Sequence, residues 1–193
     1  VRGARRAGRD ALMHLVDAYV LIEAKNRYYA FDIAPGFWAW LEQGHRTGKL
    51  ISIDALRDEL MQGDDELAEW ARGLRDFFLP IDQLTVQRFR PLSDWARHQN
   101  YRQSALNEFS SDRADFLLIA HAIGHGDTVI TNEQPSPQAQ KRVKIPVACA
   151  AMGVATADIF TVLRKTGAAL HLVDSAETEP RAETRAPTIP GLD

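Results

Sequence analysis

The chain has 193 residues, of which 45% are apolar and 25% are charged, and its formal net charge is −3. These values are ordinary for a globular domain, and they exclude the strongly basic class of protein that coats nucleic acid. The single cysteine, Cys149, excludes an internal disulfide framework and favours a reducing, cytoplasmic environment. The chain holds no run of 18 apolar residues, so we expect no membrane span.

Charge and composition divide the chain into three parts. Residues 1–12 carry four Arg and one Asp, and we expect a flexible N-terminal extension there. A signal peptide is not expected, because charged and polar residues interrupt the apolar run that follows. Residues 13–173 hold the patterned apolar segments and predict a single α/β domain. Residues 174–193 are rich in Pro, Thr and Glu, and they predict a disordered acidic tail.

Short apolar segments alternate with amphipathic ones along the domain. We predict strands at 13–16, 49–53, 128–131, 143–147 and 168–173. We predict helices at 18–26, 35–48, 55–62, 64–78, 112–123 and 158–167, and a helical region at 81–109 that Pro91 breaks or kinks. Asp54 and Asp112 are the predicted N-caps of two of these helices. This alternation indicates an α/β fold with a mostly parallel central sheet covered on both faces.

Four acids fall where such a sheet binds ligands. Asp17 and Glu133 follow predicted strands, and parallel sheets bind ligands at the carboxyl ends of their strands. Glu59 and Asp115 lie on the apolar stripes of their predicted helices at about 100° per residue. Each acid has an ordinary alternative role, as a turn residue, a loop acid, an arginine partner or a helix cap respectively. Four crowded carboxylates repel one another, however, and we interpret them as ligands of a divalent metal ion.

Several short motifs, taken in order, resemble those of PIN-domain nucleases. They are "LVDAYVLI" near the start, "DEL" on an early helix, "ADFLLIAHA" on a later helix and "VITNE" after a strand. Many bacterial members of that family, the VapC-like group, are toxins of type II toxin–antitoxin pairs. The longer segments "IEAKNRYYAFDIAPGFWAWLEQG" and "DELMQGDDELAEWA" resemble a bacterial PIN-like subgroup catalogued as a domain of unknown function.

The resemblance implies a PIN-like three-layer α/β/α fold and an endoribonuclease. It implies one set of metal ligands and catalytic residues: Asp17, Glu59, Asp115 and Glu133. These would hold one or two Mg²⁺ or Mn²⁺ ions, which activate water to cut an RNA phosphodiester bond. A cognate antitoxin is the implied protein partner, and a homodimer is left open. Tyr19 stands where the family often has Asn or Ser, and Glu133 stands where it usually has Asp.

Four further residues are candidates for auxiliary roles. Thr131 and Asn132 follow the same strand as Glu133, and they can orient water or a metal ligand. Lys25 and Arg27 lie beside aromatic residues and can contact phosphates, although a solvated helix end is the plainer interpretation.

The sequence leaves two other functions open. The departures at Tyr19 and Glu133 favour a catalytically silent PIN-like binding module. A metal-dependent DNA nuclease of related fold is disfavoured by the net negative charge. His121 and His125 have the i, i+4 spacing of a helical zinc pair, but Ala122 stands where a metalloprotease has Glu. We interpret both histidines as structural or surface residues.

Overall fold

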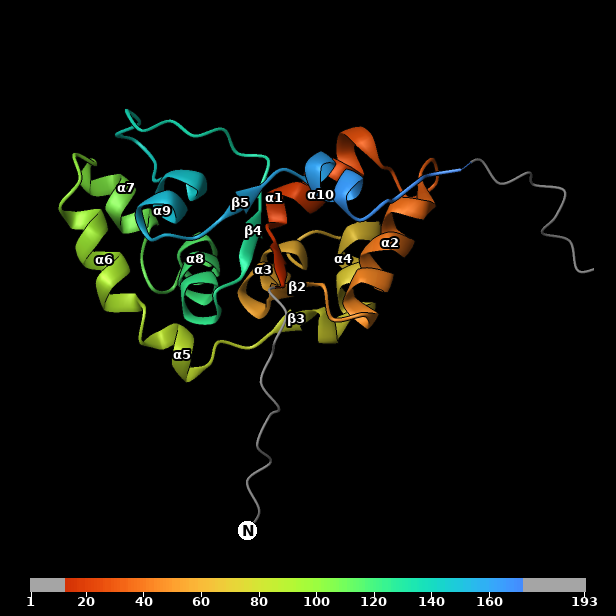
Figure 1. The fold of residues 1–193 in the computed structure, drawn as a ribbon, viewed down its shortest axis with the longest axis horizontal. Coiled ribbons are helices and arrows are strands. Elements are labelled where there is room, and N and C mark those ends of the chain that lie inside the picture. Colours follow the sequence, from red (N-terminus) through yellow and green to blue (C-terminus); the bar gives the residue numbers. More distant parts are fainter. Residues whose placement is uncertain (1–12, 172–193) are drawn as a thin grey trace, which may run out of the picture.

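A five-stranded parallel sheet organises the chain in the computed structural model, which describes residues 13–171 (Figure 1). The predicted extension at 1–12 and tail at 174–193 lie outside these residues. The strands are β1 (His14–Val16), β2 (Leu50–Ile53), β3 (Phe78–Leu79), β4 (Thr128–Ile130) and β5 (Thr156–Ala157). They lie in the order β3-β2-β1-β4-β5, and every neighbouring pair is parallel. All four residues of β2 are buried, which is typical of a parallel strand covered on both faces.

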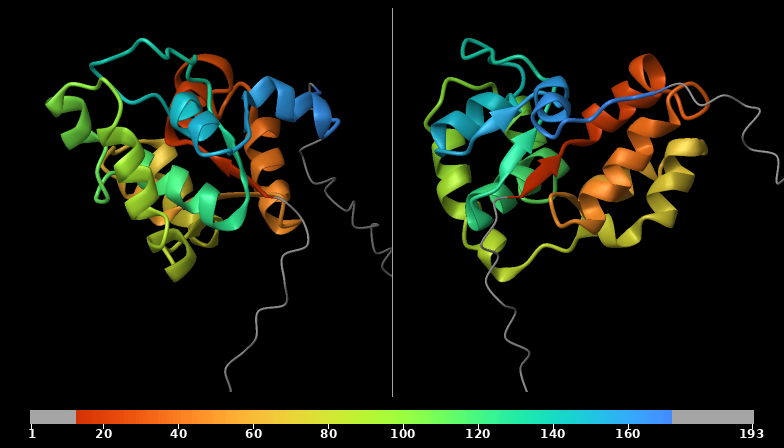
Figure 2. Two further views of the ribbon diagram at one scale, coloured as in Figure 1. Left: turned by 60° about the vertical axis from the view of Figure 1, so that its left-hand side comes forward. Right: turned by 45° about the vertical axis from the view of Figure 1, so that its right-hand side comes forward.

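Helices cover both faces of the sheet, so the predicted three-layer α/β/α fold is confirmed (Figures 1 and 2). They are α1 (Ala18–Glu23), α2 (Pro35–Arg46), α3 (Asp54–Leu60), α4 (Glu66–Gly73), α5 (Gln83–Val86), α6 (Phe89–Arg97), α7 (Gln103–Glu108), α8 (Ala114–His125), α9 (Ile145–Ala151) and α10 (Ile159–Lys165). A π-helical turn (Ala24–Tyr28) follows α1, and a 3₁₀ turn (Arg75–Phe77) precedes β3. None of the helices in the described range 13–171 is long and apolar enough to cross a bilayer.

Helix α8 is the most deeply buried helix among residues 13–171. Every residue from Phe116 to Ala122 is buried, and the helix packs against α3, α9, β2 and β4. It ends at Gly126, which adopts a left-handed conformation with φ of 74°. Glycine meets this requirement at a helix C-terminus without the strain that a Cβ atom imposes. The helix therefore begins on the side of the carboxyl ends of the strands, where Asp115 lies, and ends beside the amino end of β4.

Two predicted strands are wrong. Residues 143–147 do not form a strand, because Ile145 begins helix α9 and Pro146 lies in its first turn. A proline there needs no hydrogen-bond partner for its nitrogen, and its fixed φ suits the start of a helix. The predicted strand at 168–173 is absent over its described part, 168–171. The fifth strand is instead β5, which lies before α10.

Three predicted helical features are also wrong. Asp54 is the first residue of α3 and not its N-cap. The predicted helix at 64–78 ends at Gly73, and β3 begins at Phe78, because the buried Phe77 and Phe78 fix this segment against the core. Pro91 neither breaks nor kinks a helix, since it lies in the first turn of α6, where its missing N–H removes no helical hydrogen bond.

The contact between α5 and α8 generates a stability prediction. A Cβ atom at Gly124 would lie 2.9 Å from the carbonyl oxygen of Leu84, and backbone atoms cannot move away cheaply. We expect Gly124→Ala to destabilise the protein by about 1–3 kcal/mol in urea unfolding, although alanine favours helices. Gly73→Ala is the matched control, because its Cβ atom meets nothing within 4 Å. Equal stability of the two variants would contradict the close packing of α5 on α8.

Candidate active site

The candidate site lies where the strand order of the sheet reverses. The chain adds β2 and β3 on one side of β1, and β4 and β5 on the other side. The crevice outside the carboxyl ends of strands at such a point is the usual ligand site of open α/β sheets. Asp17 follows β1 directly, and its backbone N–H donates to the carbonyl of Ile130 at the end of β4 (3.0 Å). Asp17 and the residues after β4 therefore meet at this crevice.

Asp17 is a buried carboxylate, with 2% of its surface exposed. The hydroxyl of Thr131 donates to its Oδ2 atom (2.9 Å), and the N–H of Tyr19 donates to its Oδ1 atom (3.3 Å). Burial raises the pKa of Asp17 to about 7, and the negative charges of Asp115 and Glu133 add to the rise, against the two hydrogen bonds. The charged form of Asp17 is thus penalised, and a cation in the crevice would relieve that penalty.

Asp115 and Glu133 both contact the guanidinium group of Arg142. Arg142 Nη2 lies 2.9 Å from Asp115 Oδ2 and 3.4 Å from Glu133 Oε1. Burial lowers the pKa of Arg142, but the hydrogen bond to Asp115 and the charges of Asp115, Glu133 and Asp17 outweigh it and raise the pKa. The three carboxylates therefore act on one guanidinium group.

Glu133 is the most fully engaged of the predicted ligands. Its side chain is 7% exposed, and Lys144 Nζ lies 3.2 Å from its Oε1 atom. Its Oε2 atom accepts a hydrogen bond from the N–H of Ile145 (2.9 Å), the first residue of α9. Glu133 thus stabilises the N-terminus of a helix as well as facing the crevice.

Glu59 lies at the rim of the site. The prediction that it lies on the buried stripe of its helix is wrong: Leu56 and Leu60 form that stripe, and Glu59 is exposed. Around the helix axis, Glu59 lies about 60° from Leu56 and about 100° from Leu60, which places it at the border of the stripe rather than within it. Partial desolvation of its carboxyl group raises its pKa, and the charge of Asp115 raises it further, against Arg113 and Arg142. Glu59 therefore lies on the solvent side of the site, where the charge of Asp115 still acts on its carboxyl group.

The alternative role of Asp115 as a helix cap is not met. Arg113, and not the predicted Asp112, is the N-cap of α8, and it makes no side-chain cap hydrogen bond. Asp112 instead accepts a hydrogen bond from the hydroxyl of Ser110. Asp115 is the second residue of the helix, and its carboxylate turns to Arg142.

The four auxiliary candidates fall into different places. Thr131 contacts Asp17 directly, as described above. Asn132 donates to Glu23 Oε2 (2.9 Å) and accepts from the N–H of Ile159 (3.4 Å), so it links α1 to α10. Lys25 forms a 2.6 Å ion pair with Asp65, the N-cap of α4.

Arg27 is exposed on the π-helical turn. The predicted phosphate contacts of Arg27 and Lys25 stay predictions, and the ion pair of Lys25 gives that residue a structural role as well.

Arg142 and Lys144 are the functional candidates that the sequence reasoning missed. Their signal was the basic run "KRVK" at 141–144, eight to eleven residues after Glu133. Clefts flank the acids on two sides: one is lined by Asp115 and Arg142, and the other by Thr131 and Glu133.

Comparison with known families gives one match. A family model described as "Domain of unknown function (DUF4411)" matches residues 14–170. The chain belongs to the DUF4411 family. No curated protein matches it. The DUF4411 match covers both the crevice and the strands that build it, but its description names no activity, so the chemistry of the site has to be argued from its geometry.

The raised pKa of Asp17 generates a prediction about pH. The folded protein binds a proton at Asp17 up to about pH 7, whereas the unfolded chain loses it near the ordinary pKa of an aspartate, 3.8. The free energy of unfolding therefore falls as pH rises from about 4 to about 7, by at most about 4 kcal/mol from this group. Asp17→Asn, which preserves the shape and the capping role, should abolish this part of the fall in urea unfolding at several pH values.

The control for this experiment is Asp58→Asn, at an exposed position on α3. We expect it to follow the wild-type pH profile. Added Mg²⁺ or Mn²⁺ should stabilise the wild type at pH 8 and leave Asp17→Asn unchanged, because a ligand stabilises only the state that binds it. A pH profile shared by wild type and Asp17→Asn would contradict the burial cost at Asp17.

Proposed function

We propose that this DUF4411 protein is a metal-dependent endoribonuclease of the PIN family and the toxin of a type II toxin–antitoxin pair. The observation that carries the proposal is the grouping of Asp17, Asp115 and Glu133 at the crevice between β1 and β4, with one guanidinium shared among their charges. The PIN resemblance of the sequence motifs supports the same activity. The proposal implies a cytoplasmic protein, in agreement with its single, buried cysteine.

The residues of the crevice fit a hard divalent ion. Mg²⁺ prefers a site that supplies a few carboxylates and leaves positions for water and phosphate oxygens. Asp17 and Asp115 supply such oxygens, and the penalised charge of Asp17 provides a reason for a cation to bind. Glu133 fits less directly, because Ile145 and Lys144 engage its two oxygens. We therefore assign Asp17 and Asp115 as direct ligands, with Glu133 and Glu59 acting through water at the edge of the site.

A bound Mg²⁺ or Mn²⁺ ion would supply an activated water and neutralise charge on the scissile phosphate. Thr131 and the N–H of Tyr19 hold the two oxygens of Asp17 in place, so the ligand is oriented before the ion arrives. Arg142 must turn away from Asp115 when the ion binds. Its side chain is 54% exposed, so the guanidinium group can then pair with a phosphate of the RNA backbone.

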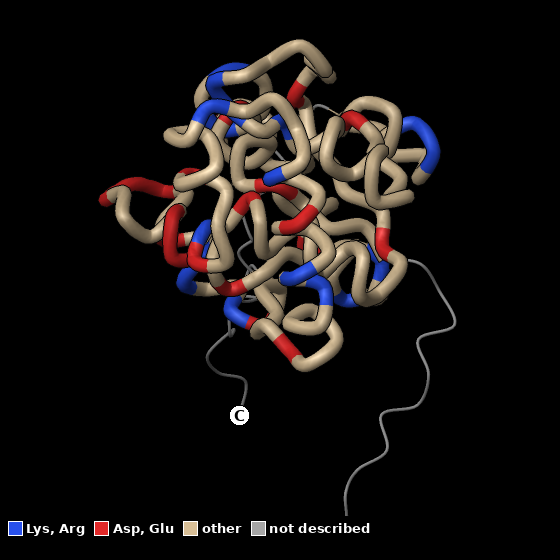
Figure 3. The backbone as a smooth tube through the Cα atoms, turned by 90° about the vertical axis from the view of Figure 1, so that its left-hand side faces the viewer, with Lys and Arg blue, Asp and Glu red and all other residues tan. Residues whose placement is uncertain are grey.

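The charge pattern supports RNA over duplex DNA. Figure 3 shows acidic and basic positions mixed along the backbone, with no continuous basic face on the side in view. Duplex binding depends on neutralising many phosphates, whereas single strands are also held by stacking on exposed aromatic rings. Tyr19 and Tyr28 are 47% and 49% exposed on α1 and the following π turn, near the crevice.

An apolar surface beside the site supports the expected protein partner. Tyr19 and Ile22 lie one helical turn apart on α1, and Tyr28 contacts the ring of Phe160 (5.8 Å) on α10. All four side chains are at least 36% exposed. An antitoxin helix or tail with apolar residues would cover this surface, and a basic residue of the partner would reach the acids.

The activity test is cleavage of single-stranded RNA by the purified full chain. We expect cleavage with Mg²⁺ or Mn²⁺ and none with EDTA. Asp17→Asn and Asp115→Asn should each lower the rate by at least about 100-fold, since each removes a direct metal ligand. Asp58→Asn is the control and should cleave at the wild-type rate. Cleavage that persists in both site variants, after repurification to exclude contaminants, would reject the proposal.

The cations in the crevice favour a second candidate, the silent binding module. If Arg142 and Lys144 replace the metal permanently, calorimetry with Mn²⁺ at millimolar concentration will show no binding. If they only compete with it, Arg142→Gln should bind Mn²⁺ several-fold more tightly, because removing one such ion pair changes the balance by on the order of 1 kcal/mol. Lys141→Gln, an exposed neighbour, is the control and should bind Mn²⁺ as the wild type does.

A further inference from the structure

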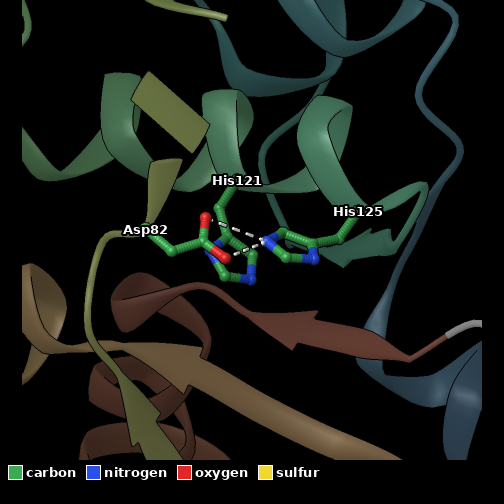
Figure 4. Close-up of side chains that lie close together, drawn as sticks. All are labelled: Asp82, His121 and His125. Atoms are coloured by element: carbon green, nitrogen blue, oxygen red, sulfur yellow. Dashed lines mark hydrogen bonds and ion pairs between the residues drawn. The ribbon is translucent and has the colours of Figure 1, made fainter. Parts of the chain in front are cut away.

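A second group of potential metal ligands lies at the opposite edge of the sheet. His121 and His125 come from the last turns of α8, and Asp82 is the N-cap of α5 (Figure 4). Asp115 begins the same helix, so ten residues, or ~15 Å of helix, separate it from His125. This group is therefore distinct from the carboxylates of the crevice.

The three side chains already converge. One ligand atom from each lies within 4.8 Å of the others, and Figure 4 shows the Asp82 carboxylate directed at the two rings. His125 Nε2 lies 3.1 Å from Asp82 Oδ2, and the rings of His121 and His125 stack with centroids 4.2 Å apart. Ligands at 2.0–2.2 Å from a tetrahedral Zn²⁺ ion lie roughly 3.3 Å apart. Binding thus requires the ligand atoms to close by up to about 1.5 Å, and the two stacked rings have to turn so that one nitrogen of each points at the ion.

Neighbouring groups orient the three ligands. The N–H and the hydroxyl of Thr85 both donate to Asp82 Oδ1 (3.1 and 2.9 Å), and both oxygens of Asp82 face His125 Nε2, Oδ1 at 3.2 Å and Oδ2 at 3.1 Å. Thr85 Oγ1 also lies 3.2 Å from His121 Nδ1. Burial would raise the pKa of Asp82, but these hydrogen bonds and His125 lower it to about 2. Asp82 is therefore an ionised ligand at any physiological pH.

Asp127 supplies a second, independent observation. It is 4% exposed, and its Oδ1 atom accepts a hydrogen bond from the N–H of Met13 (3.0 Å). Its Oδ2 atom accepts none from the residues in the range 13–171 and faces His121 Nε2 at 4.0 Å. A carboxylate behind an imidazole is the arrangement that fixes the tautomer of a metal-bound histidine and raises its basicity. Nδ1 of His121 is the nitrogen on the side of Asp82, and its 3.2 Å contact with Thr85 Oγ1 has to be exchanged for the metal ion.

We propose that Asp82, His121 and His125 bind one transition-metal ion of the Zn²⁺ class, which joins α5 to the end of α8. Two imidazoles and one carboxylate favour Zn²⁺, Co²⁺ or Ni²⁺ over Mg²⁺, which prefers oxygen ligands alone. The side chain of His121 is 2% exposed, that of His125 15% and that of Asp82 40%. The ion would therefore enter from the Asp82 side, where water completes its coordination.

The test uses the full chain without a histidine tag, stripped with EDTA. Calorimetry with Zn²⁺ should show one tight site per chain, and Co²⁺ should give the visible absorption bands of a tetrahedral N/O site. Asp82→Asn and His125→Gln should weaken Zn²⁺ binding by more than about 10-fold, since even outer-shell changes cost about 10–100-fold. Both residues lie toward the surface, and asparagine is as good an N-cap as aspartate, so these variants should fold.

Two controls make the result decisive. His98→Gln removes an exposed histidine on another helix end and should bind Zn²⁺ as the wild type does. Asp115→Asn removes an acid of the crevice and should also leave Zn²⁺ binding unchanged. The proposal is overturned if wild type binds no Zn²⁺, if Asp82→Asn and His125→Gln bind it equally well, or if Asp115→Asn abolishes binding. In each of those cases the group is only an ion pair between α5 and α8.

Discussion

The burial of one carboxylate, that of Asp17, constrains the rest of the crevice. Asp17 directly follows β1, at the point where the strand order reverses. The neighbouring strands therefore remove its carboxylate from water. Its charge then has to be offset by hydrogen bonds, as from Thr131, or by a cation. The guanidinium group of Arg142 and the proposed metal ion would each offset the negative charge of these carboxylates. The proposed metal binding would relieve the free-energy cost of burying the charge of Asp17.

Sequence periodicity predicted those parts of the fold in which the buried face dominates. The strands β1, β2 and β4 and the helices α2, α8 and α10 lie within a few residues of their predicted bounds, because their apolar runs have a clear period and their ends carry stop residues such as Gly48. The errors concern short elements. Strands β3 and β5 have two residues each, too few for any period to emerge. Two wrong predictions came from prolines. Pro91 and Pro146 were expected to break a helix and to lie in a strand, but both lie in the first turn of a helix, where proline is favourable.

Sequence order placed the candidate ligands better than helical geometry did. Asp17 and Glu133 could be located because residues after parallel strands share one edge of the sheet. The burial of Glu59 could not, since a position one residue from Leu60 can fall on either side of a stripe border. Two residues were not predicted, for a common reason. They are Arg142, which contacts two of the acids, and Asp82, which contacts His125. Arg142 and Asp82 reach their sites from segments whose positions depend on tertiary packing alone.

The brevity of the outermost strands has a consequence for the protein in a crowded cell. A long, flat border strand exposes a row of unsatisfied amides and carbonyls, to which the strand of another molecule can attach. Here β3 and β5 close the sheet with two residues on either side, so they offer almost no template for such growth. The apolar, aggregation-prone segments of β1, β2 and β4 are kept in the middle of the sheet. This arrangement disfavours association of two molecules through their sheet edges.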